Sequence, residues 1–121
     1  CLPKTAWPPT YADYQAAKRL LEQDLTAILS FNDEMAFGAR EAVTEVGLKV
    51  PDDVSLVGFD NWDLSGYANM KLTTVERNMG EIAREGTRIL LRRLEEGIID
   101  NRRVYLENRL IIRETVKNLN A

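Results

Sequence analysis

Two short apolar segments, separated by an amphipathic one, constrain the fold of this chain more than any other feature of its sequence. The first is TAILSF at residues 26–31, and the second is VSLVGF at residues 54–59. Nearly continuous apolar runs of this length are typical of strands that are buried on both faces, as in a parallel sheet. The sequence therefore predicts a βαβ unit with two parallel strands and a right-handed crossover.

The segment between the two runs has the pattern of a helix. Asn32 is placed to cap it, and Asp33 and Glu34 follow in the first turn, where the helix dipole favours carboxylates. Gly47 is placed to end the helix. The expected buried stripe has helical spacing and consists of Met35, Ala39, Ala42 and Val46.

The rest of the chain adds further predicted elements on both sides of this unit. A helix is expected from Thr10 to Asp24, an extended segment at residues 72–75, and a long helix roughly from Asn78 to Glu96 that Gly97 ends. RVYLEN and RLIIRE are expected to form two more strands. The predicted fold class is α/β, a three-layer parallel sheet flanked by helices. The apolar stripe of the long helix consists of Met79, Ile82, Ala83, Gly86, Leu90 and Leu94.

Composition excludes several classes of function. The net charge of −3 gives these 121 residues little attraction for nucleic-acid phosphates. No apolar run approaches the ~20 residues that a membrane span needs, so no membrane partner is expected. The absence of His removes the commonest metal ligand and general base, and we expect no metal and no cofactor. The single Cys1 fits a reducing, cytoplasmic compartment.

Each apolar run is followed by a polar residue. Asn32 comes after the first run and Asp60 after the second. Because ligands of open parallel sheets bind beyond the carboxyl ends of the strands, we expect both side chains at the rim of one cleft. A carboxylate, an amide and an aromatic face suit a sugar or nucleoside, and Trp7 and Trp62 are the candidate aromatic platforms. The alternative is local: Asn32 caps a helix and Asp60 begins a turn.

Residues 27–61, together with LTTV and RLIIRET, resemble the lactose-repressor/galactose-repressor family of bacterial transcription regulators. The matching segment reads AILSFNDEMAFGAREAVTEVGLKVPDDVSLVGFDN, and the likeness extends from Thr10 to Thr115. The resemblance implies the C-terminal portion of a periplasmic-binding-protein-like effector domain. It also implies that the DNA-binding headpiece, the hinge helix and most of the N-terminal subdomain are absent from these residues, which begin at Cys rather than Met.

The resemblance implies roles for particular residues. Asp60 falls on the effector-binding carboxylate of the family, Asn32 on the hydroxyl-binding amide, and Trp7 on the stacking aromatic. Arg77 falls near the floor of the cleft, where the family more often has an amide, and it suggests an acidic or phosphorylated sugar. We therefore expect the effector to contact Trp7, Asn32, Asp60, Trp62 and Arg77.

The family dimerises through this subdomain, and its interface positions fall on Phe37 and Tyr67, to which we add Leu64. Phe37 shares a predicted helix face with polar residues, so it would be a large aromatic on a polar surface. The long helix packs on the absent subdomain in the family. We expect its apolar stripe to be covered instead by a second chain in a swapped arrangement, or by the parent protein.

These inferences predict a regulator in which a sugar-like effector closes a two-lobed cleft and changes how a dimer sits on operator DNA, which is contacted only through the headpiece. The alternative is part of a solute-binding protein for sugar transport. An enzyme is not expected. Asp60 with Asp63, or Asp33 with Glu34, could be offered as an acid–base pair, but such neighbours seldom converge on one bond. The helix dipole explains Asp33 and Glu34 better.

Overall fold

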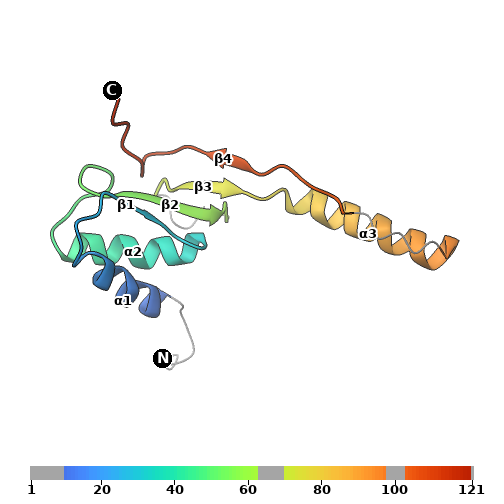
Figure 1. The fold of residues 1–121 in the computed structure, drawn as a ribbon, viewed down its shortest axis with the longest axis horizontal. Coiled ribbons are helices and arrows are strands. Elements are labelled where there is room, and N and C mark those ends of the chain that lie inside the picture. Colours follow the sequence, from blue (N-terminus) through green and yellow to red (C-terminus); the bar gives the residue numbers. More distant parts are fainter. Residues whose placement is uncertain (1–9, 63–69, 98–102, 121) are drawn as a thin grey trace. The chain divides into compact units, whose positions relative to one another are not determined.

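The computed structural model describes residues 10–62, 70–97 and 103–120 (Figure 1). The chain divides into two compact units. Unit 1 comprises Cys1–Glu76 and Leu110–Ala121, and unit 2 comprises Arg77–Arg109. The elements in chain order are α1 (Thr10–Leu20), β1 (Ala27–Leu29), α2 (Asp33–Glu45), β2 (Ser55–Asp60), β3 (Thr73–Glu76), α3 (Met79–Glu96) and β4 (Arg109–Ile111).

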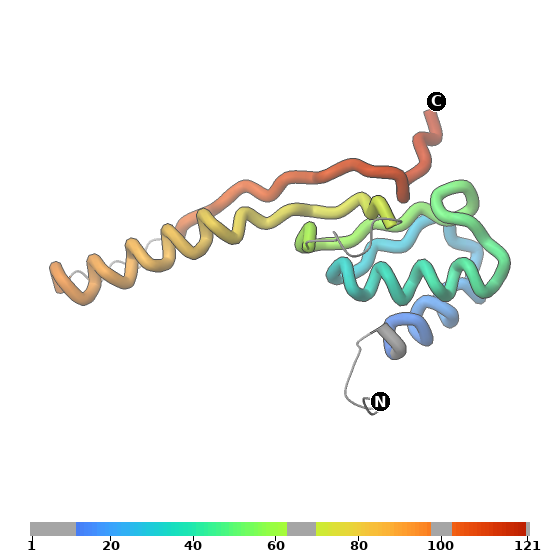
Figure 2. Tube along the Cα trace, turned by 180° about the vertical axis from the view of Figure 1, so that it is seen from behind, coloured from blue at the N-terminus to red at the C-terminus, as the bar shows by residue number. Residues whose placement is uncertain are grey.

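The four strands form one sheet in the order β1-β2-β3-β4. β1 pairs in parallel with β2, with Ile28 opposite Leu56, and β2 pairs in parallel with β3, with Gly58 opposite Thr74. The tube view in Figure 2 follows the same path from behind, and β4 runs in the direction opposite to β3. The predicted βαβ unit with parallel strands is confirmed, as is the α/β class.

Both helices of unit 1 lie on the same side of the sheet (Figures 1 and 2). α2 packs against β2, and α1 packs against α2. Alanines on α2 allow the close approach of helix and strand, because a small side chain adds little thickness between them. The buried core residues are Ala17, Ile28, Ala36, Ala39, Ala42, Val43, Val54, Leu56, Met70 and Leu72. The described helices of unit 1 thus supply one of the two flanking layers that we predicted.

The prediction that the first strand is buried on both faces is wrong. Ile28 faces the core, but Leu29 is 76% exposed and Phe31, just after the strand, is 83% exposed. The reason is the one-sided placement of the helices, because side chains alternate across a strand and only one face of this sheet meets α2. The outward-pointing apolar side chains of this run therefore lie on a face of the sheet that no described helix of unit 1 covers.

Local signals placed the ends of α2 correctly, but the end of α1 and the segment before β4 differ from the prediction. α2 begins after Asn32, and Gly47 has a left-handed φ of +83° just beyond the helix end. α1 ends at Leu20, four residues before Asp24. Residues 103–108 form no strand, contrary to the prediction for RVYLEN. The backbone groups of a strand need hydrogen-bond partners on a neighbouring strand. β3 has only four residues, so it offers no partners beyond those that β4 uses.

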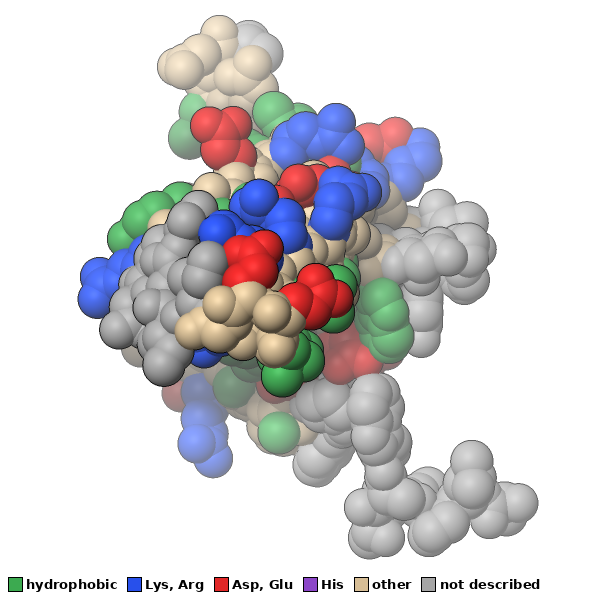
Figure 3. All heavy atoms as spheres, turned by 90° about the vertical axis from the view of Figure 1, so that its right-hand side faces the viewer, with side chains coloured by type: hydrophobic (Ala, Val, Ile, Leu, Met, Phe, Trp, Pro, Cys, Tyr) green, Lys and Arg blue, Asp and Glu red, His purple; other side chains and the backbone are tan. Residues whose placement is uncertain are grey.

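Unit 2 contains the predicted long helix with both predicted ends. The Asn78 side chain accepts a hydrogen bond from the Glu81 N–H at 3.0 Å, and Gly97 ends α3 with a φ of +65°. Arg88 pairs with Glu85 at 2.6 Å, and Arg84 pairs with Glu81. Figure 3, seen from the α3 side, shows acidic and basic side chains intermingled with hydrophobic ones. No residue of α3 is buried, and the exposed apolar ones include Met79, Ile82, Leu90, Leu91 and Leu94.

Candidate functional site

The polar residues that follow β1 and β2 lie at the same edge of the sheet. The two strands are parallel neighbours, and the Ser30 N–H donates to the Val57 carbonyl at 2.8 Å, one residue beyond β1. Asn32 comes two residues after Ser30, and Asp60 is the last residue of β2. The carboxyl ends of parallel strands are where open α/β sheets bind ligands. The sheet thus brings together the two polar residues that the sequence singled out.

Asn32 has the local role that we gave as the alternative reading. Its side-chain oxygen accepts a hydrogen bond from the Met35 N–H at 2.8 Å, with extended backbone angles typical of an N-cap. The side chain is half-buried. Because the cap uses Oδ1, the Nδ2 group is the part of this amide that can donate to a ligand. The cap therefore leaves the Nδ2 group of Asn32 uninvolved.

The next residue, Asp33, has a role that sequence reasoning missed. Its side chain is 1% exposed. Oδ1 accepts from the Thr74 hydroxyl at 2.5 Å, and Oδ2 accepts from the Trp62 N–H at 2.9 Å. The carboxylate therefore links the start of α2 to β3 and to the segment after β2. The helix-dipole explanation was incomplete, since burying a carboxylate requires partners of this kind.

Gly58 makes room for this carboxylate. A Cβ at position 58 would lie 2.2 Å from Asp33 Oδ1 and 2.7 Å from Leu72 Cδ2. Real Cβ atoms do not approach other heavy atoms so closely, so only glycine fits here while Asp33 keeps its place. A glycine inside an apolar strand often marks a close approach of this kind, and it was the signal that could have revealed the role of Asp33.

Asp60 and Asn61 bend the chain sharply at the end of β2. Their φ angles are +107° and +48°, which non-glycine residues rarely adopt. The Asp60 side chain is half-buried, and its backbone lies opposite Glu76 of β3. The Asn61 N–H donates to Thr74 Oγ1 at 3.3 Å. The direction of the Asp60 carboxylate therefore depends on a turn that Thr74 and its neighbours hold.

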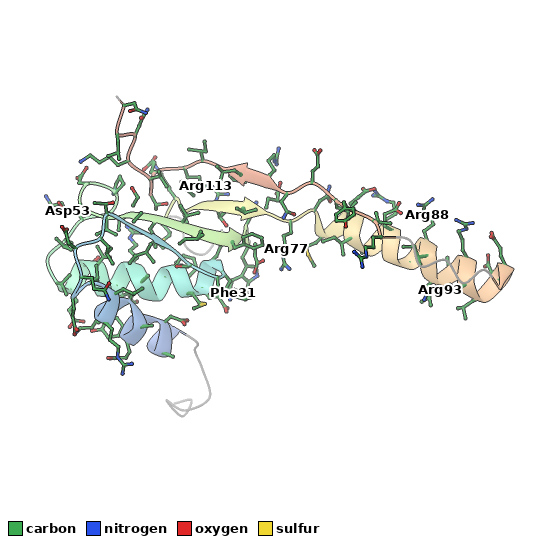
Figure 4. The ribbon with its side chains drawn as sticks, viewed as in Figure 1. Phe31, Asp53, Arg77, Arg88, Arg93 and Arg113 are labelled. Carbon is green, nitrogen blue, oxygen red and sulfur yellow. The ribbon has the colours of Figure 1, made fainter. Side chains whose placement is uncertain are left out.

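Among the remaining predicted effector residues, Trp62 has its backbone at this edge of the sheet. Trp62 follows the turn, with its backbone held by Asp33 and its side chain 51% exposed. Arg77 is exposed and is the first residue of unit 2. Trp7 lies outside the described residues. In Figure 4, Phe31 is labelled near the start of α2, and Arg113 beside β3.

The predicted dimer interface centres on Phe37, and this side chain is less exposed than we expected. Phe37 is half-buried and packs against the core, so the expectation of an aromatic standing on a polar surface is wrong. The expectation failed because the Phe37 side chain packs against the buried core cluster. Glu41 and Thr44 on the same helix are exposed. Leu64 and Tyr67 lie outside the described residues.

Within residues 10–62, 70–97 and 103–120, no group of three or more His, Cys, Asp or Glu side chains is arranged to hold a metal ion. In the same part of the chain, no helix is both long and apolar enough to cross a bilayer.

Comparison with known proteins identifies the family. A family model described as a periplasmic binding protein-like domain matches residues 2–116. The chain belongs to this family. Among curated relatives, the HTH-type transcriptional repressor PurR of Vibrio campbellii is 36% identical over 100 residues, which are 83% of this chain and 30% of that protein. The chain therefore spans about a third of the length of this relative.

Solved structures give the same assignment. A LacI-family regulator from Enterococcus faecalis V583 with bound ribose superposes with a TM-score of 0.82 at 32% identity, over 92% of this chain and 42% of that one. The lac repressor dimer bound to operator and the anti-inducer ONPF gives 0.77 at 31% identity, over 88% and 38%. The resemblance to the lactose-repressor/galactose-repressor family is confirmed. These relatives are named as transcriptional regulators, which favours a regulator over the transport alternative.

Proposed function

We propose that these residues form part of the effector-sensing domain of a bacterial DNA-binding transcriptional regulator, with a sugar-like small molecule as effector. The observation that carries the proposal is the shared edge of two parallel strands, where Asn32 comes soon after β1 and Asp60 ends β2. At the same edge, Asp33 bonds to Thr74 of β3 and to the Trp62 N–H. Effector binding changes operator affinity when the effector prefers one conformer of the regulator over the other.

The chemistry of this edge suits hydroxyl groups. The Asp60 carboxylate accepts hydrogen bonds from vicinal hydroxyls, and the Asn32 amide donates one through Nδ2. Trp62, and Trp7 by the family resemblance, supply aromatic faces on which a sugar ring stacks. The relative whose structure contains ribose supports this class of effector. Arg77 directs attention to a sugar that carries an acidic or phosphate group.

The rest of the regulator lies outside these residues in our proposal. The chain is the C-terminal portion of the effector domain, and a headpiece elsewhere in a longer cytoplasmic polypeptide contacts operator DNA, because the net charge of −3 gives this part little attraction for nucleic-acid phosphates. Neither cofactor nor catalysis is part of the proposed mechanism. The matched residues cover only 30% of the PurR relative, which supports placing the DNA-binding headpiece outside them.

Dimerisation is part of the same proposal. The face of α2 that carries Glu41 and Thr44, next to Phe37 and with Leu64 and Tyr67, forms a homodimer interface. Because Phe37 also packs on the core, replacing it would test stability as well as association. Glu41→Lys is the cleaner variant, and it is expected to weaken self-association of the full-length protein in sedimentation without changing its thermal stability.

The test of effector binding is a thermal-shift measurement on the full-length product of the gene. D-ribose, D-ribose 5-phosphate and adenosine cover the neutral sugar, the phosphorylated sugar and the nucleoside. We expect at least one of them to raise the Tm, because a ligand that binds only the folded state stabilises it. Asp60→Ala should abolish the shift, whereas Asp52→Ala, at an exposed position of unit 1, should preserve it. A shift that survives Asp60→Ala, or no shift with any of the three, contradicts the proposed site.

A further inference from the structure

The side chain of Asn61, next to Asp60, is held at both of its ends. Its Nδ2 donates to Glu76 Oε1 at 3.0 Å, and its Oδ1 accepts from Arg113 Nη2 at 2.6 Å. Arg113 is itself fixed, because its Nη1 donates to the Leu72 carbonyl at 2.7 Å and its N–H donates to Thr73 Oγ1 at 2.9 Å. The Asn61 amide thus donates a hydrogen bond to one segment of the chain and accepts one from another, and these two segments are distant in sequence.

These two segments are the ones by which the chain leaves and re-enters unit 1. Glu76 is the last residue of unit 1 before residues 77–109, and Arg113 follows the return at Leu110. One side chain therefore bridges the outgoing and the returning segment. It does so one residue after the carboxylate that we assign to the effector.

The backbone at this point needs such support. Asp60 and Asn61 both have positive φ, a conformation that the surrounding structure must over-determine if it is to persist. Two backbone bonds also contribute, from the Asn61 N–H to Thr74 and from the Trp62 N–H to Asp33. The Thr74 hydroxyl accepts from Asn61 and donates to Asp33, so the same small network reaches α2.

We propose that Asn61 is a positioning residue for Asp60: its bridge from Glu76 to Arg113 holds the turn that aims the carboxylate and makes that aim depend on the two connecting segments. The proposal rests on the proposed function, since it assigns Asn61 a role at the effector site. A relative shift of the outgoing and returning segments breaks one end of the bridge and loosens the turn. Effector affinity at Asp60 then falls.

The first experiment measures hydrogen exchange in the full-length protein without any ligand. Asn61→Ala removes both ends of the bridge, and the protection factors of the amides at positions 61 and 62 should fall about fivefold to tenfold. Asn118→Ala is the matched control, because it makes the same change at an exposed position of unit 1 and should leave these amides unchanged. Unchanged protection in Asn61→Ala overturns the proposal.

A charge swap provides the rescue. Asn61→Asp keeps an acceptor for Arg113 but sets a carboxylate against that of Glu76, so protection should fall as in Asn61→Ala. Adding Glu76→Gln restores a donor on the other side and rebuilds the bridge with reversed polarity. Protection in the double variant should return to within about twofold of the wild type. Failure of this rescue, with the double variant folded, shows that the side chain acts by packing alone and overturns the proposal.

The second experiment measures D-ribose affinity by calorimetry with the same variants. Asn61→Ala should weaken binding about tenfold, and the double variant should restore it. Loss of protection with unchanged affinity for D-ribose overturns the positioning role. If the wild type binds none of D-ribose, D-ribose 5-phosphate and adenosine, the proposed function fails, while the exchange experiment still decides whether the bridge holds the turn. The two hypotheses can therefore fail separately.

Discussion

Asp33 and Gly58 depend on each other structurally, although neither residue stands out in the sequence. A buried carboxylate is costly unless it is hydrogen-bonded, and this one is bonded to Thr74 and to the backbone of Trp62. The space that it occupies exists because residue 58 has no side chain. The edge of the sheet beside Asp60 therefore depends on one missing methyl group.

Gly58→Ala tests this dependence. The added Cβ meets Asp33 Oδ1 and Leu72 Cδ2, so we expect the free energy of unfolding to fall by roughly 1–3 kcal/mol. Urea unfolding of the full-length protein measures it. Gly80→Ala is the matched control: it lies in the first turn of α3 outside the apolar stripe, its added Cβ meets Asn78 Oδ1 at an ordinary 3.8 Å, and it should not lower stability. Equal effects of the two substitutions would refute the steric argument.

Asp13 on α1 gives a prediction about pH. Its Oδ2 is buried and, within the described residues, has no hydrogen-bond partner. Burial raises the pKa of this carboxyl above its ordinary value. The folded state therefore binds the proton more tightly than the unfolded state does. The resulting stabilisation is complete below the unfolded pKa and is lost as the pH rises through the folded one.

Asp13→Asn removes this charge, so we expect the variant to have a higher Tm than the wild type at pH 7. The difference should shrink as the pH is lowered through the carboxyl range, where the wild type becomes neutral too. Thermal unfolding monitored by circular dichroism between pH 3 and pH 7 provides the measurement. A wild type that is more stable than Asp13→Asn at neutral pH would show that the carboxylate is satisfied in solution.

At the scale of the elements, the ends of α2 and α3 were predictable and strand environments were not. The caps Asn32 and Asn78 and the stops Gly47 and Gly97 depend on residues within one turn, so the sequence displays them directly. The exposure of Leu29 depends on which elements cover the sheet, and no local pattern contains that information.

The same distinction divides the candidate site. The positions of Asn32 and Asp60 followed from strand order, which the βαβ pattern predicts. The bonds from Asp33 span 29 residues to Trp62 and 41 to Thr74, and the Arg113 bond to Asn61 spans 52. Contacts of such separation are set by the whole fold, so a carboxylate that reads locally as a dipole partner became the centre of a network.

The two roles of Asn32 can be separated by substitution. Asn32→Ser keeps an oxygen that caps α2 but removes the Nδ2 donor, so stability should change by less than about 0.5 kcal/mol while effector affinity falls. Asn32→Ala loses both, and it should also cost about 1 kcal/mol of stability. Chemical denaturation and calorimetry with the effector found by thermal shift provide the two readouts. Full affinity in Asn32→Ser would leave the residue with capping alone.

At the scale of the whole molecule, α3 displays more apolar surface than a stable solitary helix should. Leu94 is 72% exposed, and Met79, Ile82 and Leu90 are also exposed along the helix. Burying a side chain of this size stabilises by ~1.5–3 kcal/mol. We therefore expect the isolated 121-residue chain to associate with a second copy through α3, while the full-length protein covers the helix internally.

Sedimentation velocity of the isolated chain tests this expectation. Leu90→Lys combined with Leu94→Lys should shift the chain toward the monomer. Glu95→Lys is the matched control, because it alters the net charge by the same amount at an exposed position outside the apolar stripe and should leave the mass distribution unchanged. A monomeric mass for the unsubstituted chain at micromolar concentrations would refute the association.

The neighbouring placement of β3 and β4 makes unit 2 an excursion from an otherwise continuous sheet. The chain departs after Glu76 on one strand and resumes at Leu110 on the adjacent strand, which runs the opposite way (Figure 1). Adjacent antiparallel strands need only a tight two-residue turn such as Asn-Gly to join them. Excising residues 77–109 and joining β3 to β4 by such a turn should yield a smaller sensing unit that lacks the exposed apolar surface of α3. In this shortened protein, a β-hairpin would bring Glu76 and Arg113 together around Asn61.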